Sequence, residues 1–263
     1  MTFSSSYIFF LRTNDMNILH SLKHQIPNLI TLGNLLCGVL ACIYTYEETL
    51  HIAALFICLG IFLDFFDGLT ARLLGVSSPM GKELDSLADV VTSGVAPGMM
   101  LFVILAQLSS LTWLSYLALL IPLFAAYRLA KFNLDTRQSH SFLGLPVPSN
   151  ALIWVGIALT TNCCIFNTTE EIIPIIENPV FPYCLIAISL VTDILMVSEL
   201  PMFSLKFNFK DLSWKTNRVQ YIFLIGCAII IALTRQWYAI SLIILWYILF
   251  SLLTQRKHTP DEQ

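Results

Sequence analysis

Four aspartates with helical spacing stand out in a chain that is otherwise poor in charge. They are Asp64, Asp67, Asp85 and Asp89, and each lies within or beside a long apolar run. At about 3.6 residues per turn, Asp64 and Asp67 share one helical face, and so do Asp85 and Asp89. Because a short connection joins the two segments, we expect the two helices to pair antiparallel with these faces opposed.

Four converging carboxylates repel one another unless a cation neutralises them. Hard oxygen ligands favour Mg²⁺ or Mn²⁺ over zinc, and Mg²⁺ commonly binds a few carboxylates together with substrate phosphates. Four acids suffice for two ions, the arrangement that clamps the attacking and leaving oxygens during displacement at phosphorus. The spacing therefore predicts a site for two divalent ions and phosphoryl-transfer chemistry.

Small residues and one arginine share the same helical faces. Gly68, Ala71 and Gly81 leave room for a bulky polar ligand to approach the backbone. Arg72 offers a fork of hydrogen-bond donors to phosphate oxygens. The plain alternative is that these are ordinary helix-end charges, because acids suit the first turn of a helix and an arginine can extend to the membrane surface. That alternative leaves the regular spacing unexplained.

The composition places this site in a membrane protein. The chain has 263 residues, of which 57% are hydrophobic and only 12% charged, and its mean hydropathy is +0.76. A soluble domain carries about a quarter charged residues. The net charge of −3, without a basic block, argues against nucleic acid as a partner. The seven cysteines form no C-x-x-C pair, which argues against a thiolate zinc site.

Apolar runs predict an all-α, polytopic transmembrane helical bundle of about eight spans. Gly94, Pro97 and Gly98 should break or bend the third span. The predicted spans are 29–46, 51–74, 86–108, 112–133, 148–166, 180–198, 219–234 and 237–254.

Loop charges predict the orientation, because Lys and Arg accumulate on the cytoplasmic side of a membrane. With eight spans, only Arg235 of the fourteen basic residues falls on the other side. Both termini and the loops at 75–85 and 134–147 are therefore expected to face the cytoplasm. We expect the protein in the cell (inner or plasma) membrane, with its active site on the cytoplasmic face.

The same pattern divides the chain into segments. Residues 17–25 carry apolar side chains on one helical face, so they could lie along the membrane surface, and either Met1 or Met16 could be the true start. No cleavable secretion signal is recognisable. The predicted segments are an N-terminal cytoplasmic or interfacial part at 1–25, a catalytic core at 26–200, a cytoplasmic connector at 201–218, a hairpin at 219–254 and a tail at 255–263.

One sequence pattern resembles a known family. The string D-x-x-D-G-x-x-A-R-x8-G-x-x-x-D-x-x-x-D is matched without a gap and is similar to the signature of the CDP-alcohol phosphatidyltransferases. The matching residues are Asp64, Asp67, Gly68, Ala71, Arg72, Gly81, Asp85 and Asp89. The resemblance implies an all-helical membrane fold, commonly a homodimer, that binds CDP-diacylglycerol at a dinuclear centre, transfers the phosphatidyl group to an alcohol and releases CMP.

The resemblance also assigns roles to these residues. The four aspartates would be metal ligands; Asp85 and Asp89 would be catalytic, and Asp89 would also be the general base on the incoming hydroxyl. The residues that would contact the cytidine or diphosphate are Asp67, Gly68, Ala71, Arg72 and Gly81.

Three further stretches resemble the branch of this family that uses L-serine: residues 26–34, residues 84–97, and residues 128–133 followed by 144–148. Serine brings a carboxylate, so a cation should lie near the metals. Arg128 is favoured over Lys131 for that role, although either could simply follow the cytoplasmic charge bias. Asn28, Asn34 and Ser93 could line the pocket, or could serve as helix caps or interhelical hydrogen bonds.

Three alternatives stay open at this point. The same chemistry could use glycerol 3-phosphate, inositol, inositol phosphate or choline as the acceptor. A cation transporter could use intramembrane carboxylates, but polar residues should then continue across the bilayer. A membrane scaffold without activity would leave the spacing of the signature residues unexplained.

Overall fold

The computed structural model describes residues 3–76, 78–108, 111–134, 142–166, 173–176, 178–202, 217–234 and 236–255. Residues 203–216 of the predicted connector and 256–263 of the predicted tail lie outside these ranges. The first half of the described chain consists of α1 (Phe3–Tyr46), α2 (Leu50–Leu74), α3 (Pro79–Asp89), η1 (Val90–Val95), α4 (Ala96–Leu108), α5 (Thr112–Ser115), η2 (Tyr116–Leu119) and α6 (Leu120–Leu134).

The second half begins with a short strand and is otherwise mostly helical. Its elements are β1 (Phe142–Leu143), α7 (Val147–Phe166), α8 (Ile173–Ile176), α9 (Phe181–Val197), β2 (Pro201–Met202), α10 (Arg218–Thr234) and α11 (Ala239–Gln255). The two strands pair antiparallel, with Phe142 opposite Met202. The helical class predicted from the sequence is therefore confirmed, with one two-stranded ribbon in addition.

Within the described ranges, four helical stretches are long and apolar enough to cross a membrane. They are Gln25–Tyr46, Leu50–Leu74, Pro79–Leu108 and Thr112–Leu134. Four shorter apolar helices follow: Val147–Thr161, Phe181–Val197, Arg218–Thr234 and Ala239–Thr254. Each of the eight predicted spans falls on one of these helices. The chain is a helical membrane protein, while the number of crossings and the orientation of the termini stay predictions.

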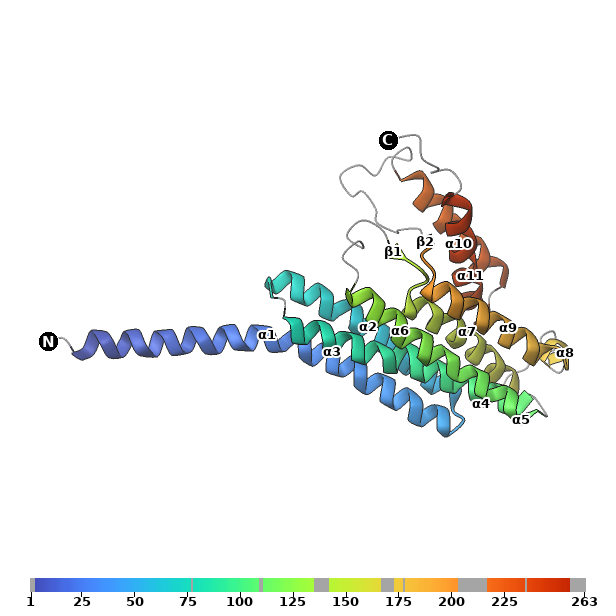
Figure 1. Ribbon diagram of the computed structural model, residues 1–263, viewed down its shortest axis with the longest axis horizontal. Coiled ribbons are helices and arrows are strands. Elements are labelled where there is room, and N and C mark those ends of the chain that lie inside the picture. The colour runs from blue at the N-terminus through green and yellow to red at the C-terminus, as the bar shows by residue number, and fades with distance from the viewer. Residues whose placement is uncertain are drawn as a thin grey trace.

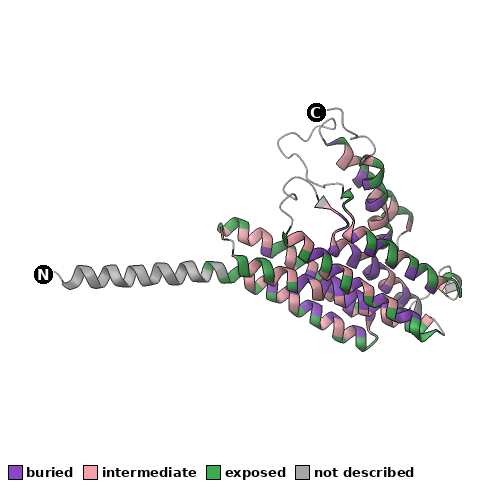
Figure 2. Ribbon diagram, viewed as in Figure 1, coloured by how far each residue is buried: buried purple, intermediate pink, exposed green. Residues whose placement is uncertain are grey.

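Buried residues gather inside the helical bundle (Figure 2). They form two hydrophobic clusters, which meet at the partly buried Ile157 and Ile188. The larger cluster joins α2, α4 and α7 around Trp154 and Ile57, with contributions from α1 and α9. The smaller cluster joins α6 and α9 to α10 and α11. In Figure 1, α10 and α11 form a pair that is inclined to the rest of the bundle. Large apolar side chains such as Leu55 and Leu123 stay exposed, as a lipid-facing surface requires.

Two helices differ from their predicted bounds. The helix that carries Asp85 begins at Pro79, capped by Ser78. Helix α1 begins at Phe3 and includes residues 17–25, whose position along the membrane surface stays a prediction. Near Gly94, where a break or a bend was predicted, the helix is not broken and continues from Pro79 to Leu108. Instead, η1 is a π-helical turn, in which the N–H of Ala96 bonds to the carbonyl of Val91. Such turns absorb one extra residue within a helix.

Close contacts between backbones fix how these helices cross. A Cβ atom on Gly38 of α1 would lie 2.4 Å from Oγ1 of Thr92, and one on Gly60 of α2 would lie 2.4 Å from Cγ2 of the same residue. Thr92 of η1 therefore sits in a notch formed by two glycines. On the opposite face, a Cβ atom on Gly98 would lie 2.8 Å from Cδ of Pro122 in α6. These contacts hold α1, α2 and α6 around the π turn.

Candidate active site

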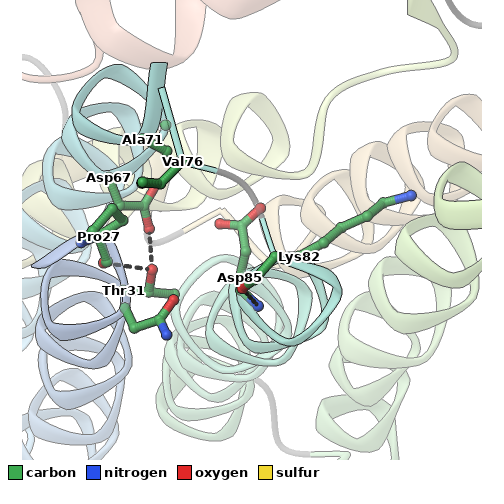
Figure 3. A pocket seen from close by; sticks show the side chains of 11 residues that line it. Pro27, Thr31, Asp67, Ala71, Val76, Lys82 and Asp85 are labelled. Atoms are coloured by element: carbon green, nitrogen blue, oxygen red, sulfur yellow. Dashed lines mark hydrogen bonds between the residues drawn. The ribbon is translucent and has the colours of Figure 1, made fainter. Parts of the chain in front are cut away.

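Three of the four predicted carboxylates meet between α2 and α3. Asp64 and Asp67 come from the last turns of α2, and Asp85 comes from α3. Each offers one oxygen atom, and these atoms all lie within 4.8 Å of one another. Figure 3 shows Asp67 and Asp85 on opposite sides of the same space. The two predicted helical faces therefore oppose each other.

The fourth carboxylate, Asp89, lies one turn deeper along α3. It is buried, and it interacts electrostatically with Asp64, Asp67 and Asp85, but it is not part of the tight group of three. Its Oδ1 atom accepts a hydrogen bond of 3.2 Å from Nδ2 of Asn34 in α1. The site thus consists of a compact cluster of three carboxylates and a fourth one held beside it.

A cavity of about 240 Å³ opens beside the cluster (Figure 3). Its wall is formed by Pro27, Asn28, Thr31, Asp67, Gly68, Ala71, Val76, Ser78, Gly81, Lys82 and Asp85. Of the predicted nucleotide contacts, Asp67, Gly68, Ala71 and Gly81 therefore line one cavity. A Cβ atom added at Gly68 would meet nothing within 4 Å. The backbone there is open to a ligand.

Thr31 is a cavity residue that the sequence did not single out for a role. Its hydroxyl lies 2.5 Å from Oδ2 of Asp67 and 3.1 Å from the carbonyl oxygen of Pro27 (Figure 3). The hydroxyl has one proton, which it donates to either acceptor. It lies one turn after Asn28 and one turn before Asn34, within residues 26–34, which resemble the serine-using branch of the family. Its helical spacing from those two residues was the available signal.

The start of α3 is held by polar contacts that sequence reasoning also missed. The hydroxyl of Ser78 accepts from the N–H of Gly81 over 2.9 Å, which caps the helix. Lys82 extends away from the cavity, as Figure 3 shows, and its Nζ donates to the carbonyl of Asn133 in α6 over 3.0 Å. The side chain of Asn133 in turn donates to Ser86 over 2.8 Å. These contacts fix the start of α3 against α6, while the cavity itself lies between α1, α2 and α3.

Arg72 occupies a different place from the other predicted nucleotide contacts. Its side chain is exposed, its Nε donates to the carbonyl of Gly68 over 2.9 Å, and it is not among the residues that line the cavity. Arg72 follows the cavity residue Gly68 by one helical turn, and its guanidinium lies against the carbonyl oxygen of that residue. A phosphate contact from Arg72 stays a prediction.

The two cations predicted for the acceptor differ in their surroundings. Arg128 is buried, interacts electrostatically with Asp89, and its Nε has no hydrogen-bond partner within the described part of the chain. Lys131 forms an ion pair of 3.3 Å with Glu199, and the two side chains are 36% and 60% exposed. Both line a small second cavity with the end of α9. Only Arg128 lies beside the carboxylates.

The three polar residues predicted to line the pocket have different surroundings. Asn28 lines the main cavity, as proposed for the nucleotide or acceptor pocket. Ser93 is buried in the π turn, and no hydrogen bond of its hydroxyl is found in the described chain. Asn34 forms the interhelical hydrogen bond to Asp89 that the sequence left as one of two alternatives.

The donor set fits a divalent cation. Three carboxylates with converging oxygens, in a partly buried position, supply the hard oxygen ligands that Mg²⁺ and Mn²⁺ prefer. No lysine or arginine forms an ion pair with any of the three in the described ranges, so their charge calls for another counter-ion. The cavity at Gly68 leaves room for a phosphate to share that ion.

Comparison with known proteins connects this geometry to a family. A family model described as CDP-alcohol phosphatidyltransferase matches residues 24–180. A Bacillus subtilis protein named CDP-diacylglycerol–serine O-phosphatidyltransferase is 43% identical over 140 residues, which is 53% of this chain and 78% of that protein.

Proteins of the same name from other organisms are also similar. The one from Methanocaldococcus jannaschii is 33% identical over 148 residues, covering 56% of this chain and 67% of that protein. The one from Helicobacter pylori strain J99 is 35% identical over 138 residues, which covers 52% of this chain but only 58% of that protein. The matched regions thus correspond to about half of this chain.

Proposed function

Since the chain belongs to the CDP-alcohol phosphatidyltransferase family, we propose that it transfers the phosphatidyl group of CDP-diacylglycerol to the hydroxyl of L-serine. The products are phosphatidylserine and CMP. The observation that carries this proposal is the cluster of Asp64, Asp67 and Asp85 beside a cavity whose wall is open at Gly68. A diphosphate needs both a counter-charge and close access to backbone, and these residues supply both.

The aspartates would hold two Mg²⁺ or Mn²⁺ ions, with Asp89 contributing to the second. When bound, these ions neutralise the diphosphate and stabilise the charge that develops on the leaving CMP. Thr31 keeps Asp67 oriented toward the cavity through its hydrogen bond. Gly68, Ala71 and Gly81 admit the nucleotide to the cavity wall.

Asp89 is proposed as the general base. It lies one helical turn after Asp85, beside the cluster of three, and we place the incoming alcohol between Asp89 and the diphosphate, at hydrogen-bond distance from the carboxylate. The serine hydroxyl gives its proton to Asp89, its oxygen attacks the phosphorus nearer the lipid, and CMP leaves with the bond electrons. No covalent intermediate with the protein is required.

Arg128 is proposed to select an acceptor with a carboxylate. Its guanidinium is buried next to Asp89, and its unpartnered Nε has a hydrogen bond left to offer. A guanidinium binds a carboxylate through two parallel hydrogen bonds. The names of the similar proteins point to serine as that acceptor. Lys131 is less suited, because Glu199 already pairs with it.

The setting of the reaction is also a proposal. We place the cavity at the cytoplasmic face of the cell membrane, because the loop at 75–85 lies on the side of the predicted topology that is rich in Lys and Arg. Water-soluble serine and CMP then exchange with the cytoplasm, while the acyl chains stay in the lipid layer. A homodimer is expected from the resemblance to the family.

The test is acceptor-dependent release of CMP. Purified protein in detergent micelles is incubated with CDP-diacylglycerol, Mn²⁺ or Mg²⁺, and one acceptor at a time: serine, glycerol 3-phosphate, inositol, inositol phosphate or choline. We expect CMP and phosphatidylserine with serine and neither product after chelation of the metal. CMP with another acceptor alone would overturn the serine assignment, and CMP with none of them would overturn the proposed function.

A further inference from the structure

Asn34 of α1 is fully buried, yet it touches the one carboxylate that stands apart from the cluster. Its Nδ2 donates to Oδ1 of Asp89 over 3.2 Å, across an interface between two helices. Asn34 is absent from the walls of both cavities. We propose that Asn34 is a positioning residue, which orients Asp89 for the proposed reaction without contacting substrate.

The hydrogen bond distinguishes the two oxygens of Asp89. An amide N–H on Oδ1 holds that oxygen toward α1, so Oδ2 is the atom left to face an ion or to accept the serine proton. A hydrogen bond to an ionised acceptor is stronger than one between neutral groups. A carboxylate held in one rotamer also avoids the entropic cost of being oriented during the reaction. Partners of this kind, one step behind a metal ligand, commonly determine how that ligand is presented.

The position of Asn34 is itself enforced by the π turn. The hydroxyl of Thr92 donates to the main-chain carbonyl of Asn34 over 3.0 Å. On the other side, a Cβ atom on Gly60 would lie 2.9 Å from Oδ1 of Asn34, so α2 lies directly against the amide. Asn34 is therefore enclosed by α1, α2 and the π turn, and its side chain has little freedom to move away from Asp89.

The direction of the amide follows from its partner. A carboxylate accepts hydrogen bonds and offers none when ionised, so the NH₂ group must face Asp89. This leaves Oδ1 of Asn34 buried, without a hydrogen-bond partner in the described chain. Burying an unpaired oxygen is unfavourable. Asn34 is thus a costly choice for a residue that only packs, which supports a role in holding Asp89.

The test replaces Asn34 by leucine, which has the same number of side-chain heavy atoms but no donor. We expect Asn34→Leu to lower kcat by about 10- to 100-fold, the usual effect of losing such a partner. The KM for CDP-diacylglycerol should stay within about threefold of wild type, because Asn34 does not line the nucleotide cavity. The matched control is Asn150→Leu, since Asn150 is also fully buried, but its side chain has no hydrogen bond to the site within the described chain and does not line the main cavity.

A second readout needs no turnover. Mn²⁺ is titrated into the substrate-free protein and followed by electron paramagnetic resonance, where we expect about 10-fold weaker binding in Asn34→Leu and no change in Asn150→Leu. Because the inference rests on the proposed function, kcat is measured with whichever acceptor the wild type uses best. If the wild type releases no CMP at all, the proposed function fails, and the Mn²⁺ titration still decides the inference.

Three results would overturn the inference. The first is an Asn34→Leu protein with raised KM but wild-type kcat, which would make Asn34 a nucleotide contact. The second is an equal loss of kcat in Asn34→Leu and Asn150→Leu, which would reduce the effect to packing. The third is that Asn34→Leu and the smaller Asn34→Ala both fail to fold in membranes while Asn150→Leu folds, which would make the residue structural.

Discussion

Oγ1 of Thr31 in α1 lies 2.5 Å from Oδ2 of Asp67 in α2, so the first helix supports a carboxylate of the second. Both residues are buried at the wall of the main cavity. Two helices that each carry apolar lipid-facing surface thus meet through a polar contact at the reaction centre. The helix that bears none of the signature aspartates therefore takes part in the site.

Replacement of Thr31 by valine removes this donor and keeps the shape of the side chain. We expect kcat/KM for CDP-diacylglycerol to fall about 10-fold, because Asp67 loses the partner that orients it. The control is Thr45→Val, since the buried Thr45 hydroxyl bonds to the carbonyl of Ala41 in its own helix. Equal activity of the two variants would contradict a role for Thr31 in orienting Asp67.

Two glycines should respond differently to the same substitution. A side chain at Gly68 meets open space, so Gly68→Val is expected to fold with unchanged thermal stability while losing CMP release and CDP binding. At Gly38 a Cβ atom would lie 2.8 Å from the backbone of Thr92, so Gly38→Val should lower the melting temperature in detergent. A destabilised Gly68→Val protein would count against an open nucleotide cavity at this position.

The cluster of three carboxylates should be destabilising without its cation. Asp64→Asn removes one of the repelling charges, so the metal-free variant is expected to be more thermally stable than metal-free wild type. The wild type should gain about 2.7 kcal/mol when Mn²⁺ is present at 100 times its dissociation constant, and the variant much less. Asp193→Asn is the control, because Asp193 is a buried aspartate of α9 outside the cluster.

Arg128 and Lys131 provide a matched pair one turn apart on α6. We expect Arg128→Ala to raise the KM for serine by about 10- to 100-fold, the effect of losing a charge-assisted hydrogen bond, with little change in the KM for CDP-diacylglycerol. Lys131→Ala loses an exposed ion pair with Glu199, which contributes about 0–1 kcal/mol to stability, and should keep the wild-type KM for serine. A larger rise in the KM for serine in Lys131→Ala than in Arg128→Ala would indicate that Lys131 binds the serine carboxylate.

The proposed orientation can be measured by chemical labelling. Met80 is exposed at the start of α3, in the loop region predicted to face the cytoplasm. In a cysteine-free background, Met80→Cys should react with a membrane-impermeant maleimide in inside-out vesicles and stay unlabelled in intact cells. Labelling in intact cells would contradict the predicted topology and place the start of α3 on the outer face.

The sequence predicted those features that one helix contains by itself. Asp64 and Asp67 share a face through their spacing alone, and the same spacing placed Gly68 and Ala71 beside them, so this part of the site followed from periodicity. The resemblance added the family, which the match of residues 24–180 confirms.

Features that depend on how helices pack were not predictable in the same way. Whether Thr31 or Asn34 reaches a carboxylate depends on the crossing of α1 with α2 and α3, and that crossing is set by Gly38, Gly60 and Thr92. Spacing along one helix contains no information about such contacts. Arg72 shows the same limit. A long flexible side chain can adopt several conformations, and here the guanidinium donates to a carbonyl of its own helix.

The π turn at Val90–Val95 contains one residue more than the same turn of an α-helix would. Loss of one residue within that turn would restore an ordinary α-helix and change the rotation between Asp89 and Gly98 only slightly, because the π turn already absorbs the extra residue. Loss of a residue from the α-helical parts on either side would instead rotate the two sides by about 100° relative to each other. Related sequences that are one residue shorter within Val90–Val95 should therefore keep their aspartates facing α2, while the packing of Thr92 against Gly38 and Gly60 changes.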